Sequence, residues 1–164
     1  MAWHRTNACS QRLAEIPGID PIGASMLVMK TPAPETFRSA RHFAAWLGLT
    51  PKNHSTAGKS KLGGITRAGD EALRSFLVVG STSLLHRVRQ RGTGSPWLID
   101  LLKRKPPKLA AVAMANKNAR IAWKLMVSGE QPSWPAIPHL RLLRRTITSF
   151  TSLIHLATPS FHLR

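Results

Sequence analysis

Two long segments carry apolar residues at every third or fourth position, and this spacing limits the possible folds more than any other feature. The first segment covers residues 70–87 and the second covers residues 108–127. Asp70 stands where a side chain can accept the free amides of a helix start, so we expect it to be an N-cap. No segment alternates apolar and polar residues between turn signals as a strand does. The sequence therefore predicts a mainly α fold.

Shorter helices are predicted before Asp70. Residues 5–16 and 22–30 flank a tight turn, and residues 39–49 form a third helix with Ser39 as its N-cap and Gly48 as its C-cap. Residues 50–69 read as a long polar loop without periodicity, and a loop of this length in a compact domain usually has a function.

The composition changes after Glu130, since no Asp, Glu or Lys follows it. We therefore expect residues 131–164 to be a disordered or irregular tail, out of frame or degenerate, with an interaction tail as the alternative. The predicted organisation is a lead-in over residues 1–12, a domain over residues 13–130 and this tail.

The net charge of the chain is +17, from 24 Lys and Arg against 7 Asp and Glu. Such a surplus repels itself unless a polyanion neutralises it. Because the cations are spread over loops and helices, nucleic acid is a better fit than an anionic membrane, although a ribosome-associated or merely soluble basic protein remains an alternative.

Neither a signal peptide nor an apolar run of about twenty residues is found, so we expect no membrane contact and a cytoplasmic protein. Cys9 is the only cysteine, which leaves no internal disulfide and no zinc knuckle.

The turn over residues 16–23, IPGIDPIG, resembles the turn of a helix-hairpin-helix. Gly18 and Gly23 would let the backbone approach a phosphate, and free amides at the start of the second helix would donate to it. Asp20 opposes this reading because its charge would repel a phosphate. An ordinary packing corner between two helices is the alternative.

The polar loop begins NHSTAGKS, which resembles a nucleotide-binding loop only in part. Asn53 stands where that motif needs glycine and no apolar strand precedes it, so nucleotide hydrolysis is not expected. Ser55 instead lies among basic residues, with His54 beside it as a candidate proton-transfer helper. A serine that attacks a phosphodiester needs cations that stabilise the negative charge on the phosphoryl oxygens, and it needs a proton acceptor. A loop that only clamps a phosphate backbone is the alternative. The basic residues are Lys52, Lys59, Lys61 and Arg67.

The stretch FAAWLGLTPKNHSTAGKSKLGGITRAGDEALRSFLVVGS closely resembles the C-terminal domain of the insertion-sequence transposases that use a bridge RNA. The resemblance extends to LAEIPGIDPIGASML upstream and NKNARIAWKLMVSGE downstream, which together cover residues 13–130. It implies that Ser55 is the nucleophile that joins to DNA, and that Lys59, Lys61, Arg67 and Arg74 hold DNA or RNA backbone. It also implies DNA and a guide RNA as partners and a homo-oligomer in the intact enzyme.

The chain departs from that family in places. Ala57 stands where the family usually has glycine, and the ending after Glu130 is unlike the family's. The RuvC-like nuclease domain that would hold Mg²⁺ has no counterpart here, so we expect no cofactor in this chain and a truncated transposase that is inactive alone. A non-enzymatic helix-hairpin-helix module that binds nucleic acid is the alternative function.

Overall fold

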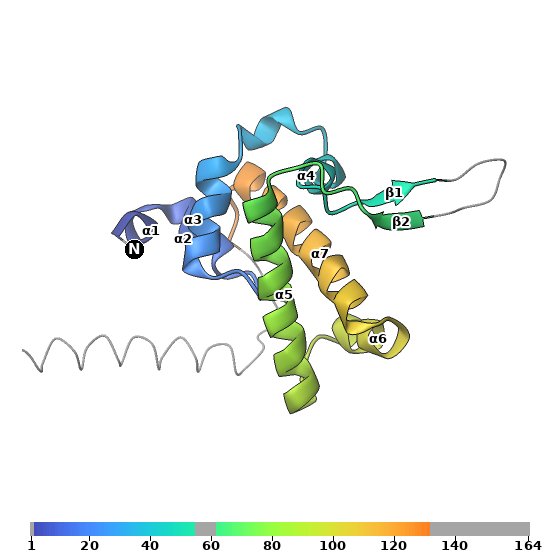
Figure 1. The fold of residues 1–164 in the computed structure, drawn as a ribbon. Helices are drawn as coiled ribbons and strands as arrows, with labels where there is room; N and C mark the ends of the chain where they lie inside the picture. The colour runs from blue at the N-terminus through green and yellow to red at the C-terminus, as the bar shows by residue number, and fades with distance from the viewer. Residues whose placement is uncertain (1, 55–61, 132–164) are drawn as a thin grey trace, which may run out of the picture. The chain divides into compact units, whose positions relative to one another are not determined.

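The computed structural model describes residues 2–54 and 62–131, and most of them are helical (Figure 1). In chain order the elements are α1 (Ala2–Thr6), α2 (Ala8–Leu13), α3 (Pro21–Lys30), the 3-10 helix η1 (Pro34–Thr36), α4 (Ala40–Trp46), the strands β1 (Pro51–Asn53) and β2 (Leu62–Ile65), α5 (Glu71–Arg91), α6 (Pro96–Arg104) and α7 (Pro107–Ser128). The predicted mainly helical fold is confirmed. The tail predicted over residues 131–164 lies outside the described residues, except for Gln131. No helix within the described ranges has the length and apolar content to cross a membrane.

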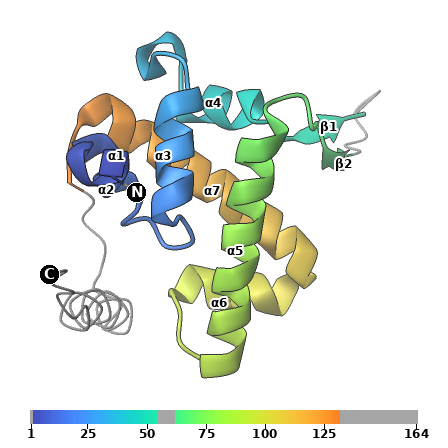
Figure 2. The same cartoon turned by 60° about the vertical axis from the view of Figure 1, so that its left-hand side comes forward.

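The two long helices, α5 and α7, pack against each other and form the centre of the fold. Asp70 begins α5 as predicted, because its carboxylate accepts the amide of Leu73 at 2.9 Å. Both helices end at a glycine in the left-handed region, Gly92 with φ 64° and Gly129 with φ 67°. In Figures 1 and 2, α3 runs beside α5, while α7 passes behind α5.

The core has two parts. The larger part lies between the N-terminal helices, α4 and the facing sides of α5 and α7, and Phe43, Leu73 and Leu77 are fully buried in it. The smaller part joins the C-terminal half of α5 to α6 and the start of α7 through Leu85, Leu98 and neighbouring side chains. Each end of the α5–α7 pair is therefore fixed by its own apolar cluster.

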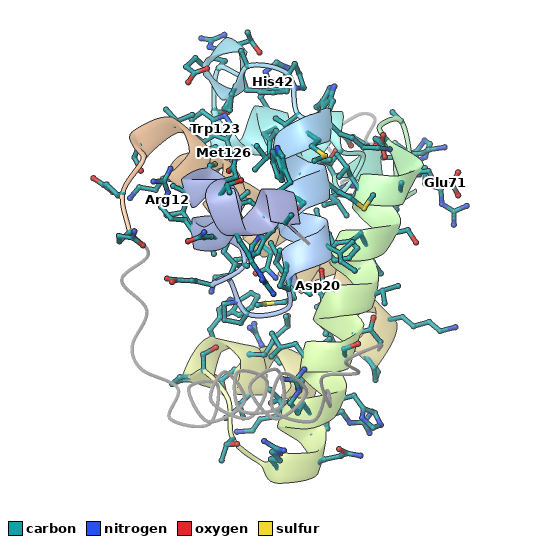
Figure 3. All side chains as sticks on the ribbon, turned by 90° about the vertical axis from the view of Figure 1, so that its left-hand side faces the viewer. Arg12, Asp20, His42, Glu71, Trp123 and Met126 are labelled. Carbon is teal, nitrogen blue, oxygen red and sulfur yellow. The ribbon has the colours of Figure 1, made fainter. Side chains whose placement is uncertain are left out.

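The turn between α2 and α3 is seated against both long helices. Gly18 has φ 90°, and its carbonyl oxygen lies so close to Gly80 that a Cβ at position 80 would be 1.9 Å away from it. Asn118 of α7 is buried and donates from Nδ2 to the Pro17 carbonyl at 2.8 Å. Asp20 caps α3 at the N-terminal end of that helix, where Figure 3 labels it.

The prediction of a loop without regular structure over residues 50–69 is wrong in part, because two strands lie within this range. β1 and β2 pair antiparallel, with Pro51 opposite Ile65 and Asn53 opposite Leu62. The three residues of β1 are all exposed, so no alternation of buried and exposed positions marked it in the sequence. β2 contains two glycines, which are depleted in strands.

Replacing Gly80 with alanine tests the close packing of the turn. In an exposed helix this change stabilises by about 1 kcal/mol. Here the new methyl group would meet the Gly18 carbonyl, so we expect a loss on the order of 1–3 kcal/mol in urea unfolding. Gly64→Ala is the control, since a Cβ there meets nothing within 4 Å. A gain of stability in Gly80→Ala would contradict the packing described.

Candidate nucleic-acid interface

β1 and β2 form an arm that projects from the helical body (Figure 1). Lys52 and His54 are exposed on the first strand side, and Gly63 and Gly64 are exposed on the second. The ring of His54 lies across from Gly63, where an added Cβ would be 3.2 Å from its Cδ2 atom. The arm thus displays a basic and an imidazole side chain without burying either of them.

The residues predicted to be at the centre of the chemistry are only partly described. Ser55, Lys59 and Lys61 lie outside the described residues. In the sequence they fall between Asn53 and Leu62, which are paired partners across the arm. The described part of the chain therefore places the two ends of this segment, and the roles of the three residues stay predictions.

The root of the arm is built from two backbone segments that cross closely. A Cβ on Gly69 would lie 1.9 Å from the carbonyl oxygen of Trp46, so only glycine fits there. Arg67 has φ 58°, a left-handed value that is uncommon outside glycine. Its amide donates to the Gly48 carbonyl at 3.3 Å, and its side chain is exposed. Arg67 is thus held at the base of the arm with its guanidinium free of the core.

Arg74 has a structural place that the sequence analysis missed. It is buried, with 8% of its surface exposed, and Nη1 donates to the carbonyls of Leu47 at 3.3 Å and Gly69 at 3.0 Å. It therefore joins the two segments that cross at the arm root. The sequence could have predicted this burial, because Arg74 lies three positions before Leu77 on the apolar side of α5. A phosphate contact by Arg74 stays a prediction, while its contacts in the structure are with carbonyls.

The glycines of the turn between α2 and α3 are also occupied by packing. The amide of Gly23 donates to the Asp20 carboxylate at 2.7 Å, which puts a negative group where a phosphate was predicted. A Cβ on Gly23 would overlap the ring of Phe76. Gly18 meets Gly80 as described above. These contacts favour the packing-corner alternative, and phosphate binding at Gly18 and Gly23 stays a prediction.

The comparisons with known proteins agree on one family. The model of the transposase IS116/IS110/IS902 family matches residues 10–94, which begin in α2 and end just beyond α5. The chain belongs to this family. A Sinorhizobium fredii protein named as transposase y4pF/y4sB is 68% identical over 132 residues, covering 79% of this chain and 34% of its own length. A Yersinia enterocolitica protein, named the transposase for insertion sequence element IS1328, is 41% identical over 121 residues, 73% of this chain and 36% of its own. The transposase-family chain thus spans about a third of the length of these curated relatives.

One serine–histidine contact in this transposase-family chain lies away from the arm. His4 Nδ1 is 2.7 Å from Ser10 Oγ, which is also 3.2 Å from Ser25 Oγ. Such a pair can activate a hydroxyl for attack. Ser10 is fully buried, however, so no substrate reaches it; its contact with His4 fastens α2 to α1, and its contact with Ser25 fastens α2 to α3. Nothing in the sequence pattern pointed to this contact.

No metal centre is formed by the residues that the structure describes. Across residues 2–54 and 62–131, no three His, Cys, Asp or Glu side chains are grouped so that they could hold an ion. The described ion pairs are Lys30 with Asp70 at 2.9 Å and Lys103 with Asp100 at 3.8 Å. The amide of Leu73 and the ammonium of Lys30, in that order, hold the pKa of Asp70 below its ordinary value.

Arg74→Met separates a structural role of this arginine from a phosphate contact. The change removes two hydrogen bonds to carbonyls at a buried site, so we expect a loss of about 2 kcal/mol in urea unfolding. Lys52→Met, at an exposed position on the arm, is the matched control and should change stability by less than about 0.5 kcal/mol. An unchanged urea midpoint together with weaker DNA binding in Arg74→Met would instead show a phosphate ligand.

The lowered pKa of Asp70 predicts how stability depends on pH. Its contribution is complete above the unfolded pKa of about 4 and is lost as the pH falls through the lower folded pKa. Asp70→Asn keeps a good N-cap but removes the charge. We expect the variant to unfold at lower urea than the unmodified chain at pH 6, and the two midpoints to converge by about pH 2. A difference that stays constant across this range would contradict the charge effect.

Proposed function

We propose that this chain is the part of an insertion-sequence transposase that binds DNA and, in the intact enzyme, supplies the nucleophile for strand transfer. The observation that carries the proposal is the arm. In a chain of the transposase family, β1 and β2 bring together the two ends of the segment that holds Ser55. The three residues of β1 are exposed, so this side of the arm contributes nothing to the core.

The proposed chemistry is a transesterification at a DNA phosphodiester. Ser55 Oγ would form a bond to phosphorus, the bond from phosphorus to one ester oxygen would break, and that oxygen would leave as a hydroxyl. The proton of the serine would pass to a base, a proton from that base or from water would reach the leaving oxygen, and the number of phosphoester bonds would be unchanged. His54 is the nearest titratable side chain in the sequence and is exposed, so it is the candidate acceptor within this chain.

The electrostatic side of this step rests on cations on the first strand of the arm and at its root. Lys52 is exposed on β1 and Arg67 is exposed at the root. With Lys59 and Lys61, they would neutralise a phosphate backbone and stabilise charge on the phosphoryl oxygens during attack. A chain with a net charge of +17 is drawn to any polyanion, so these cations position the arm on DNA and do not by themselves select a sequence.

Further parts of the proposal concern the whole enzyme. The relatives extend over about three times the length that this chain covers. By its resemblance to bridge-RNA transposases, the intact enzyme would bind a guide RNA and act as a homo-oligomer, with Mg²⁺ held by a nuclease domain. The described residues form no group that fits a metal ion, so we assign no step of this chain to a metal.

Trapping of a covalent adduct tests the proposal. The purified chain would be combined with the remaining part of the Sinorhizobium fredii relative, Mg²⁺, the RNA transcribed from the element and end-labelled DNA from its termini. We expect a DNA adduct that survives denaturation in detergent, that Ser55→Ala abolishes and that Thr56→Ala retains. DNA affinity should be unchanged in Ser55→Ala, since the hydroxyl carries no charge.

Two outcomes would decide against this chemistry. An adduct that persists in Ser55→Ala would place the nucleophile elsewhere. The absence of any adduct from a mixture that binds and cuts the DNA would favour the alternative function, in which the arm clamps a nucleic-acid backbone without reacting with it.

A further inference from the structure

The outer face of α7 carries a row of positive charge that the predicted site did not include. Lys117, Arg120 and Lys124 are spaced at i, i+3 and i+7, which puts them on one side of the helix. Arg120 and Lys124 are exposed and Lys117 is half-buried. The buried side chains of α7, such as Ala115, Asn118 and Ala122, lie on the opposite side and face the core.

This positive row has no described counter-charge. The sequence contains no Asp or Glu between Asp100 and Glu130, so α7 itself supplies none. Among the described residues of α6 and α7, the ion pair formed is that between Lys103 and Asp100. Like charges three and four positions apart on a helix repel one another. The arrangement therefore costs stability in the free chain, and an anionic chain along the helix would relieve this repulsion.

A half-exposed tryptophan stands at one end of the row. Trp97, at the start of α6, has 38% of its surface exposed, and Lys117 Nζ lies 3.9 Å from the centroid of its ring. This cation–π contact links the aromatic ring directly to the positive row. Aromatic rings beside a basic track are the elements with which proteins bind single-stranded nucleic acid, because every unpaired base can stack on them.

The positive row of α7 also lies near the root of the arm. Asn116, the residue before Lys117, donates from Nδ2 to the Leu49 carbonyl at 3.2 Å. Leu49 precedes β1 by two residues, so the row passes close to the root of the arm. The row from Lys117 to Lys124 extends about 10 Å along the helix axis, enough to contact several backbone phosphates.

We propose that the outer face of α7, together with Trp97, binds single-stranded nucleic acid, with phosphates along Lys117, Arg120 and Lys124 and an unpaired base on the indole. A membrane is a poorer occupant, because the exposed large apolar residues of α7, Leu109 and Val127, stand at opposite ends of the helix and form no continuous apolar stripe. This surface does not depend on Ser55 and is separate from the arm.

Salt titration of binding to a labelled single-stranded oligo-dT tests the charges, with the full chain folded as judged by circular dichroism. The triple variant Lys117→Gln, Arg120→Gln, Lys124→Gln should make the slope of log affinity against log salt shallower by about 2, at about 0.7 for each lost phosphate contact. The control variant Arg87→Gln, Arg89→Gln, Arg91→Gln removes the same charge from the end of α5 and should change the slope by less than about 0.7.

The stacking role is tested by Trp97→Ala and Trp97→Phe. We expect Trp97→Ala to weaken single-strand binding about tenfold, Trp97→Phe to retain most of it, and a duplex of the same length to respond to neither. Ser55→Ala should leave all these values unchanged, so a failure here is distinct from a failure of the proposed chemistry. Equal slopes for the two triple variants would overturn the proposal. So would an equal loss of duplex binding in Trp97→Ala, or binding through these cations to phosphatidylserine vesicles that oligo-dT does not compete.

Discussion

Among the described residues, two backbone crossings bring a carbonyl oxygen so close to a glycine that no side chain fits there. At Gly69 the backbone passes the Trp46 carbonyl, and at Gly80 it passes the Gly18 carbonyl, with an added Cβ only 1.9 Å from oxygen in both cases. The first crossing fixes the root of the arm relative to α4. The second seats the turn between α2 and α3 on α5. Removing the first contact would loosen the base of the arm that carries Lys52 and Arg67, because interiors are close-packed and a displaced backbone segment has no alternative seat.

These crossings explain why some of the fold could be predicted and some could not. Helix starts were predictable, since Ser39 and Asp70 cap α4 and α5 through local hydrogen bonds that the sequence itself encodes. Glycines are ambiguous in a sequence, because approach to a phosphate and approach to another backbone require the same absence of a Cβ. At Gly18 and Gly23 the structure shows the second kind of contact, and that depends on α5, which is distant in the chain. The strands of the arm were missed for a related reason: a hairpin that is exposed on β1 carries no pattern of burial.

The positive charges divide in a way that composition cannot show. Arg74 donates to two carbonyls and belongs to the framework, Lys30 pairs with Asp70, and Arg67 and Lys52 remain at the surface of the arm. A count of +17 therefore overstates what is available to a partner at any one place. What matters is where cations lie side by side without an acid between them. In the described chain, Lys117, Arg120 and Lys124 provide this arrangement along about 10 Å of α7.

An arm rooted this firmly and yet exposed along β1 combines two properties that strand transfer would need. In the proposed strand transfer, a segment carrying the nucleophile would have to reach a phosphate outside the protein, so the core could not hold it. The base of that segment would have to be fixed, so that the segment points in one direction. The arm root meets the second requirement through Gly69, Arg74 and the left-handed Arg67. The single strand proposed along α7 would then start near the same root, because Asn116 ties α7 to Leu49. If that single strand continues into a DNA duplex, the duplex would lie close to the arm. The two surfaces together would then favour one orientation of the bound nucleic acid, whereas net charge alone would allow many orientations.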